Sequence, residues 1–423
     1  MKEKLIDAKA GINVARINAQ RIMDRCEQLA RCSEQADGLT RVFLSKEMRA
    51  VYDLVAAWMS EAGMNVRYDA IGNIIGRYEG VQRGAPCLML GSHLDTVRNG
   101  GKYDGMLGVI SPIECVQSLH DNKKRLGHAV EIIGFADEEG VRFGTTLLGS
   151  RAIAGTFDPK VLDARDKDGL SMREAIAAFG LDPTAIEKAA YAQRDVLAYA
   201  EIHIEQGPVL EAENLPVGVV TAINGFSRLR VELTGVAGHA GTVPMNLRND
   251  AMAAAAECVL AIETVANSDP ELVGTVGRLE VKPGAINVIP GNVLFTIDLR
   301  APRDSVRTSA VERAIAQVHA IGKRRGVTVA IETLQATDQA ASADWLMDQL
   351  DQAVATEGIP VRRLPSGAGH DGMALKHLTD ICMLFVRCEK GISHNPAEAM
   401  TTADAGVSAR VLARFIEDFK PKA

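Results

Sequence analysis

Side chains that could bind metal follow one short apolar segment of the chain. Residues 87–90 are apolar, and His93, Asp95 and Asp104 come after them, with Asp104 eleven residues beyond His93. Imidazole nitrogen and carboxylate oxygen are donors that zinc and related divalent cations take. We expect the Asp95 carboxylate to accept the ring N–H of His93, which would fix the nitrogen left free for metal. Asp104 has two carboxylate oxygens and could bridge two cations.

Further candidate ligands lie at the ends of other apolar segments. The acidic pair Glu138-Glu139 follows residues 130–136 directly. Two cations about 3.5–4 Å apart need one bridging carboxylate and further ligands for each cation. Five residues meet that count: Asp104 as the bridge, His93 and His203 for one cation, and Glu139 and His394 for the other. Glu138 then stays free of metal, and in a shielded pocket its pKa could rise enough for general-base catalysis. Each residue alone would fit an ordinary turn, so the hypothesis depends on the whole set.

Strand-like and helical patterns alternate along most of the chain. Six segments indicate strands, at 66–68, 73–78, 87–90, 130–136, 196–205 and 381–386. Helical spacing indicates helices at 4–32, from Ser45 onward, and at 106–120, 342–357 and 402–418. The alternation predicts an α/β fold, a mixed and largely parallel sheet with helices on both faces. Because the carboxyl ends of parallel strands meet at one edge, polar residues that follow the strands should converge there.

A different pattern occupies residues 221–336. A strand at 227–234 precedes a helix at 249–266, and strands at 273–281 and 292–300 precede a helix at 304–325 and a strand at 327–334. This order is typical of a ferredoxin-like α+β domain, with a small antiparallel sheet and helices on one face. We therefore expect an inserted domain at 221–336 within a catalytic domain made of residues 1–220 and 337–423.

Charge and composition limit the classes of partner. The net charge of −7 argues against nucleic acid, whose phosphates require a basic surface. The first thirty residues carry charges throughout, which indicates neither a signal peptide nor a membrane span. The seven cysteines include no C-x-x-C pair, so a thiolate zinc site is not indicated. We expect a cytoplasmic protein that acts on a small molecule.

The motifs together resemble the hydantoinase/carbamoylase family of amidases, a branch of the di-zinc aminoacylase/carboxypeptidase clan. The resemblance covers nearly the whole chain and is carried by nine motifs: His93-x-Asp95, Asp104-Gly, Glu138-Glu139, His203-Ile-Glu-Gln-Gly-Pro, Gly238-His239-Ala-Gly, Asn287-Val-Ile-Pro-Gly, Asp298-Leu-Arg300, Gly369-His370-Asp371 and Ser393-His394-Asn-Pro-Ala-Glu. Peptidases of the clan usually place a carboxylate where His203 stands and a longer segment between His93 and Asp104. The histidine at position 203 and the short segment before Asp104 instead resemble the branch that contains N-carbamoyl-L-amino acid hydrolases and allantoate amidohydrolases.

The resemblance implies a role for each residue of the site. It gives the same five metal ligands, with two divalent cations per subunit, Zn²⁺ first and Mn²⁺, Co²⁺ or Ni²⁺ as alternatives. The catalytic residues would be Glu138 as general base, His239 as donor to the developing oxyanion, and Asp95. The substrate would be held by Gln206, Asn287, Arg300, Gly369 and His370. It also suggests a homodimer formed through the inserted domain, with His239 reaching the partner's metals.

The expected reaction is hydrolysis of the terminal carbamoyl (ureido) group of a small carboxylate, such as an N-carbamoyl-L-amino acid or allantoate, with release of ammonia and carbon dioxide. Arg300 offers a planar fork that matches a substrate carboxylate, although it could instead form only a surface ion pair. An aminoacylase or dipeptidase is the alternative enzyme. A catalytically silent metal-binding homologue is the alternative of another class, but such a protein would not need Glu138.

Overall fold

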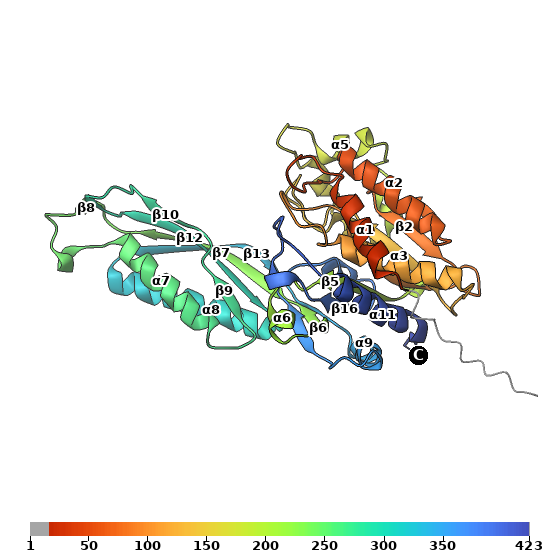
Figure 1. Ribbon diagram of the computed structural model, residues 1–423. Helices are drawn as coiled ribbons and strands as arrows, with labels where there is room; N and C mark the ends of the chain where they lie inside the picture. Colours follow the sequence, from red (N-terminus) through yellow and green to blue (C-terminus); the bar gives the residue numbers. More distant parts are fainter. Residues whose placement is uncertain (1–16, 423) are drawn as a thin grey trace, which may run out of the picture. The chain divides into compact units, whose positions relative to one another are not determined.

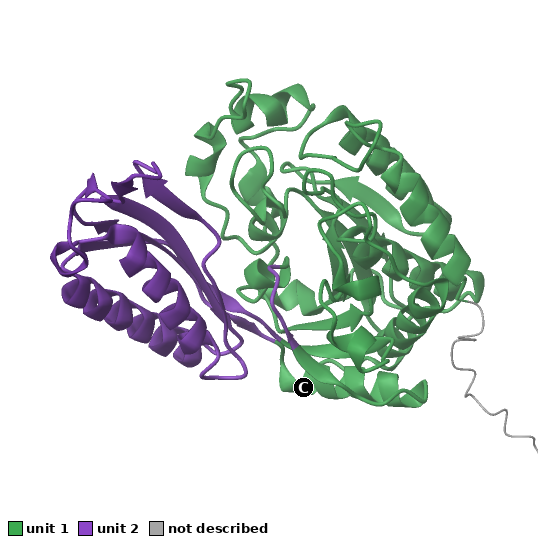
Figure 2. Cartoon of the chain, turned by 60° about the vertical axis from the view of Figure 1, so that its left-hand side comes forward, with its two compact units in different colours: residues 1–221, 342–364, 370–423 green, residues 222–341, 365–369 purple. Residues whose placement is uncertain are grey.

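The computed structural model describes residues 17–422, which form two compact units (Figure 2). The second unit comprises Ala222–Ala341 and Pro365–Gly369, and the first comprises the other described residues. The second unit ends at Ala341, five residues beyond the expected boundary at 336. The reason is that strand β14 (Ala340–Ala341) pairs with Ala222 and Ile223, which belong to the same unit.

The central sheet has nine strands within residues 17–422, in the order β1-β2-β4-β3-β5-β16-β6-β14, with β15 paired to β6. Its strands besides β14 are β1 (Asn65–Tyr68), β2 (Ile74–Tyr78), β3 (Cys87–His93), β4 (Ala129–Phe135), β5 (Val196–Ile204), β6 (Val217–Ile223), β15 (Arg363–Ser366) and β16 (Ile381–Val386). The four middle strands β4, β3, β5 and β16 run parallel, and the outer pairs are antiparallel. The mixed, largely parallel sheet predicted from the sequence is confirmed, and the carboxyl ends of the four parallel strands share one edge.

Helices cover both faces of this sheet, as predicted (Figure 1). The main apolar core packs one face of the strands against α1 (Ala19–Ala30), α2 (Lys46–Glu61), α3 (Met106–Asp121), α9 (Asp344–Thr356) and α11 (Thr402–Asp418). Leu88 and Leu90 belong to this core, so that His93, at odd spacing from them, projects from the opposite face. That face contacts the short helices α4 (Leu148–Ile153) and α10 (Gly372–Leu375). The early part of the helix expected at 4–32 lies outside the described residues.

Strand β3 is longer than the sequence suggested. The expected strand ended at residue 90, but β3 continues because Gly91, Ser92 and His93 pair with Ile133–Phe135 of β4. Gly91 has φ +153°, and a side chain there would lie 2.1 Å from the Ile133 carbonyl oxygen, so only glycine permits this close approach. His93 is therefore the last residue of a buried strand, which fixes its backbone more firmly than a loop would.

The second unit contains a five-stranded antiparallel sheet. Its elements are β7 (Gly225–Thr234), α7 (Ala251–Ala266), β9 (Val273–Thr275), β10 (Leu279–Lys282), β12 (Asn292–Ala301), α8 (Asp304–Arg325) and β13 (Thr328–Thr337). Side chains of β7 alternate between buried and exposed, and the two helices cover the buried face. The strand expected at 273–281 is two strands, because β9 pairs with Asp298–Arg300 of β12 and β10 with Asn292–Phe295. A short ribbon of β8 (Gly238–His239) and β11 (Val288–Ile289) completes the unit.

The described helices show no membrane-spanning character. Helix α8 is the longest of them at 22 residues, and it carries charged residues along its length. Across residues 17–422, no helix has both the length and the apolar composition that a bilayer crossing requires.

Candidate metal centre and active site

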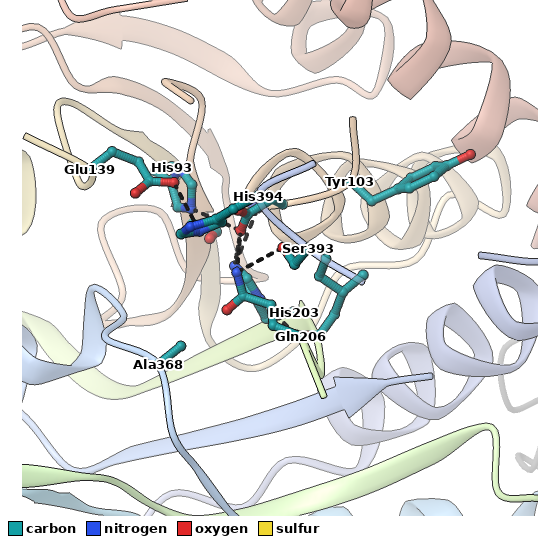
Figure 3. A network of polar contacts seen from close by, with 12 residues as sticks. His93, Tyr103, Glu139, His203, Gln206, Ala368, Ser393 and His394 are labelled. Carbon is teal, nitrogen blue, oxygen red and sulfur yellow. Dashed lines mark hydrogen bonds and ion pairs between the residues drawn. The ribbon is translucent and has the colours of Figure 1, made fainter. Parts of the chain in front are cut away.

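Five side chains from separate parts of the first unit converge at the carboxyl edge of its parallel strands, and Figure 3 labels His93, Glu139, His203 and His394 among them. They are His93 at the end of β3, Asp104 just before α3, Glu139 after β4, His203 in β5, and His394 in the loop between β16 and α11. Parallel pairing explains the convergence, because β4, β3 and β5 are neighbours and their ends lie side by side. The structure brings together all five residues proposed as ligands.

Asp104 lies at the centre of this group. Its Oδ1 is 3.7 Å from His93 Nε2 and 3.2 Å from His203 Nε2. Its Oδ2 is 3.1 Å from Nε2 of His394, and that nitrogen is 3.6 Å from Glu139 Oε1. Each carboxylate oxygen of Asp104 thus faces a different set of donors, which is the arrangement of a bridging carboxylate.

Two ligand groups that share Asp104 follow from these distances. One contains His93, Asp104 and His203, and the other contains Asp104, Glu139 and His394, with all ligand atoms within 4.8 Å of one another in each group. Nitrogen and carboxylate donors of this kind suit zinc and similar divalent cations, and neither group is closed by four protein ligands. The residues therefore fit two cations that share one carboxylate and keep positions open for substrate and water.

The electrostatics of Asp104 favour its ionised form. Burial alone would raise the pKa of Asp104, but hydrogen bonds with its three histidine neighbours outweigh burial and hold that pKa well below its usual value. Burial lowers the pKa of His93, yet the carboxylates of Asp104, Glu138 and Asp95 raise it overall. The pocket thus concentrates negative charge around imidazole nitrogens, as a cation site requires.

Glu138 is a buried carboxyl group beside the candidate ligands. It is buried, and burial raises its pKa well above the usual range, with a further contribution from Glu139. Burial also raises the pKa of Glu139, to about 7. A divalent cation would favour the ionised form of a carboxylate that it contacts directly. Glu138, Glu139 and His93 form a further group of ligand atoms within 4.8 Å, so the Glu138 carboxylate lies beside the metal donors.

Asp95 acts differently from the sequence-based expectation. The Nδ1 of His93 lies 2.9 Å from the backbone oxygen of Asp95 and 3.8 Å from its carboxylate. The carboxylate instead accepts backbone hydrogen bonds from Glu138 and Glu139, each at 3.1 Å. The chain leaves the strand after His93, so the two side chains do not share a strand face. Asp95 consequently holds the acidic pair in place and orients His93 through its carbonyl group.

Two expected substrate residues contact the ligand set. Gln206 donates from Nε2 to Asp104 Oδ1 at 3.2 Å and to Ser393 Oγ at 3.1 Å. His370 is only 1% exposed and packs edge-on against His203, with ring centroids 4.5 Å apart. Burial, and then the neighbouring His203, hold the pKa of His370 well below its usual value, which favours the neutral ring. His370 therefore packs against the ring of His203, a proposed metal ligand, and helps to fix its orientation.

Arg300 lines a cavity of about 570 Å³ within the second unit. Its Nε and Nη2 donate to both carboxylate oxygens of Asp298, at 2.8 and 3.0 Å, and its Nη1 donates to the Gly367 carbonyl at 2.8 Å. Arg228 also donates to Asp298, at 3.1 Å, and both guanidinium groups contact the ring of Phe226. Two cations and one anion leave a net positive charge in this cavity, which an anionic ligand would complement.

His239 and Asn287 lie at the other end of the second unit, close to each other. His239 pairs with Val288 across the β8-β11 ribbon, and Ala240 donates its backbone N–H to the Asn287 carbonyl at 3.0 Å. Both residues are exposed. In the β7-β12 pair Thr234 lies opposite Asn292, whereas Arg300 lies opposite Phe226, eight residues further along. At about 3.4 Å per residue, that register separates the two ends by roughly 27 Å.

Glu398 is a further residue of the site, and sequence reasoning gave it no role. It is 2% exposed and contacts the loop before α3 as well as Ser393. The motif that contains His394 ends in this glutamate, and its place in the motif was the one sequence feature that could have indicated a role for it. The sequence could not indicate its partner, because Asp104 is 294 positions away.

Comparisons with known proteins identify the family to which the chain belongs. Residues 89–418 match the family model described as Peptidase family M20/M25/M40. The chain is 43% identical to an N-carbamoyl-L-amino acid amidohydrolase of Geobacillus stearothermophilus, over 94% of this chain and 97% of that protein. It is 39% identical to allantoate deiminase 1 of Glycine max, over 93% of this chain and 88% of that protein.

Among solved structures, an amidase of the hydantoinase/carbamoylase family from Burkholderia multivorans superposes with a TM-score of 0.91 at 32% identity, covering 96% of this chain and 99% of that one. The resemblance found in the motifs is thereby confirmed, both for the fold and for the kind of enzyme. The chain belongs to the Peptidase family M20/M25/M40, on its branch of hydantoinase/carbamoylase amidases.

Proposed function

We propose that this protein is a metal-dependent amidohydrolase that removes the terminal carbamoyl (ureido) group of a small carboxylate, such as an N-carbamoyl-L-amino acid or allantoate, and releases ammonia and carbon dioxide. One observation carries the proposal: five convergent side chains that could bind metal lie beside Glu138, a buried carboxyl group with a raised pKa. A purely structural metal site needs no general base, so this arrangement argues against a catalytically silent homologue. The named activities of the relatives support the same choice of substrate.

The proposed cofactor is a pair of divalent cations, Zn²⁺ first, with Mn²⁺, Co²⁺ or Ni²⁺ as alternatives. Bound cations would polarise the substrate carbonyl and lower the pKa of water at the site. Glu138 then takes a proton from the attacking water and returns it to the leaving nitrogen, which departs as ammonia from the carbamoyl carbon. The carbamate left on the substrate nitrogen then loses carbon dioxide as its C–N bond breaks, and the nitrogen takes up a proton to become the free amine. The Asp95 carboxylate keeps Glu138 in position by accepting a hydrogen bond from the backbone N–H of Glu138 at 3.1 Å.

Arg300 is proposed to bind the carboxylate of the substrate. Its Nε-Nη2 edge is already paired with Asp298, so the substrate would use the remaining hydrogens of Nη1 and Nη2. Asp298 and the Gly367 carbonyl fix the guanidinium plane before substrate arrives, which reduces the entropy lost on binding. Gly369, two residues from Gly367 in the same unit, is proposed to line this part of the site.

His239 and Asn287 are proposed to act on a substrate held by another copy of the chain. The ribbon beside them adjoins the Thr234–Asn292 end of the β7-β12 ladder, roughly 27 Å along the sheet from Arg300, and a small ureido acid cannot span that length. One chain therefore cannot use both ends of its own second unit on one molecule. This supports a homodimer, formed through the second unit, in which His239 of one subunit donates to the oxyanion at the metals of its partner.

The experiment that tests the function is ammonia release by the purified, metal-loaded protein. The panel contains allantoate, ureidoglycolate, several N-carbamoyl-L-amino acids and the matching N-acetyl amino acids. The proposal requires turnover of at least one ureide and much slower turnover of the acetyl compounds. Preference for the N-acetyl series, followed by release of acetate, would favour an aminoacylase instead.

We predict that Arg300→Lys raises KM roughly 10- to 100-fold for carboxylate-bearing ureides, because hydrogen bonds between charged groups contribute about 1.5–3 kcal/mol. Lysine keeps the charge but loses the fork that Asp298 aligns. The matched control is Arg230→Lys, which changes an arginine of the same sheet that pairs with Glu332 and does not line the cavity, and which should leave KM close to wild type. Steady-state kinetics on each ureide and on its amide, which lacks the carboxylate, provide the comparison. Equal losses on both substrates would assign Arg300 to the fold of the second unit.

A further inference from the structure

Glu398 joins the two loops that carry the bridging aspartate and His394. Its Oε1 accepts backbone hydrogen bonds from Tyr103 at 2.8 Å and from Asp104 at 3.1 Å. Its Oε2 accepts from the hydroxyl group of Ser393 at 2.8 Å. Both carboxylate oxygens are therefore used, one on each loop, immediately beside a proposed metal ligand in both cases.

The surroundings of Glu398 are shaped around its carboxyl group. A Cβ atom on Gly101 would lie 2.0 Å from the carboxyl carbon and 2.2 Å from each carboxyl oxygen of Glu398. Gly101 is thus needed for space, since its φ is outside the left-handed range. Glu398 itself is 2% exposed and belongs to neither ligand group that contains Asp104. Its position is fixed by hydrogen bonds and packing rather than by a cation.

The loop that carries His394 requires such a fixed point. His394 has φ 54°, a left-handed conformation that costs free energy for any residue with a side chain. Its ring is about half exposed, so packing alone does not hold it. Ser393 precedes it directly, and two hydrogen bonds hold the Ser393 hydroxyl group. It donates to Glu398 and accepts from Gln206 Nε2 at 3.1 Å. Gln206 also reaches Asp104, which closes the network.

We propose that Glu398 is a positioning residue that sets the spacing between Asp104 and His394, and thereby the affinity for the cation that these two residues share with Glu139. The length of its side chain, and not its charge, is what matters. The inference rests on the proposed metal-dependent function. A loss of such an outer contact typically lowers metal affinity roughly 10- to 100-fold. The cation shared by Asp104, Glu139 and His394 should suffer more than the cation at His93 and His203, because both of those histidines lie on strands.

Two substitutions separate length from charge. Glu398→Gln keeps the reach: its amide oxygen can accept from both backbone N–H groups, and its NH₂ can donate to Ser393 Oγ. Glu398→Asp keeps the negative charge but is one methylene shorter, so it cannot hold both loops. We expect Glu398→Gln to bind Zn²⁺ almost as tightly as wild type and Glu398→Asp to lose roughly 10-fold or more at one of two sites. If the charge itself attracts the cations, the order of the two variants will be reversed and the proposal fails.

The measurement is Zn²⁺ binding to the metal-free, full-length protein, by competition with a chromogenic chelator and by elemental analysis after dialysis. Gly101→Ala should reproduce the loss, because it displaces the carboxyl group. In the Glu398→Ala background the same change meets no carboxyl group, so the double variant should bind within about two-fold of Glu398→Ala alone. Fully multiplicative losses would show that the two residues act independently and would overturn the proposal.

A matched control accounts for simple loss of stability. Glu114 is also a buried glutamate of the first unit, and it accepts hydrogen bonds from the Asn18 backbone and the Arg21 side chain. Glu114→Ala should lower the melting temperature and leave Zn²⁺ stoichiometry unchanged. A wild-type protein that binds no divalent cation would reject the proposed function itself. Two tightly bound Zn²⁺ ions in both wild type and Glu398→Asp would reject only the role of Glu398.

Discussion

Replacing Glu138 with glutamine is expected to leave the metal content at the wild-type level and to lower kcat roughly 100-fold or more. Glutamine has the same shape, and the backbone hydrogen bond from residue 138 to Asp95 does not depend on the side chain. The amide cannot accept a proton from water and return it to the leaving nitrogen. Elemental analysis and steady-state ammonia release on the same preparation give the two quantities.

Glu139→Gln provides the contrast, because Glu139 belongs to the ligand group with Asp104 and His394. Its first effect should be loss of a cation, with activity partly restored by excess metal. Added metal should do nothing for Glu138→Gln. A Glu138→Gln protein that lost metal yet kept wild-type activity per bound cation would assign Glu138 to the ligands and leave the base unidentified.

The ligands could be predicted where the chain itself determines their position. His93 and His203 lie at or near the ends of strands, and Glu139 lies just after a strand. An apolar segment followed by polar residues was therefore sufficient to predict them as candidate ligands. The parallel order of the middle strands then makes convergence at one edge unavoidable. His394 is different, because it lies in a loop between β16 and α11. Its assignment came from the resemblance and from the need for a fifth ligand.

The remaining details depend on contacts that local patterns do not contain. Asp95 was expected to bind the His93 ring through its carboxylate, but the turn after β3 directs that carboxylate to the backbone of the acidic pair. Glu398 meets residues nearly 300 positions away, and no periodicity signals such a contact. The separation of Arg300 from the end of the ladder beside the β8-β11 ribbon follows from the register of β7 and β12, which the sequence left undetermined. The order of helices and strands was readable because it needs only local periodicity.

Mixing two inactive proteins should restore activity if the site is completed between subunits. His239→Ala removes the proposed oxyanion donor, and removal of one such donor typically lowers kcat roughly 100- to 1000-fold. Glu138→Gln removes the base. In a mixed dimer with His239 acting on the partner's metals, one site combines the intact Glu138 of one chain with the intact His239 of the other. The second site of that dimer carries both substitutions and is inactive.

The expected recovery has a definite size. Each mixed dimer should show about half of wild-type activity, and random exchange makes about half of all dimers mixed, so an equal mixture should reach about a quarter of wild type. A control mixture of Glu138→Gln with Glu139→Gln should recover nothing, because both residues lie in the first unit and belong to the same site. Subunit exchange is verified with differently tagged chains.

The register of the second unit is the reason to expect recovery. Within one chain, Arg300 lies at one end of the ten-residue β7-β12 ladder, and the ribbon that carries His239 adjoins the other end, so the ladder keeps the two residues apart. A substrate whose carboxylate is bound by Arg300 must therefore receive its oxyanion donor from a different chain, or from no histidine of the second unit. An equal mixture that exchanges subunits and remains inactive would show that no histidine of the second unit donates to the oxyanion. His239 would then have no catalytic role in either chain, and the low activity of His239→Ala would have to arise from the β8-β11 ribbon that it helps to form.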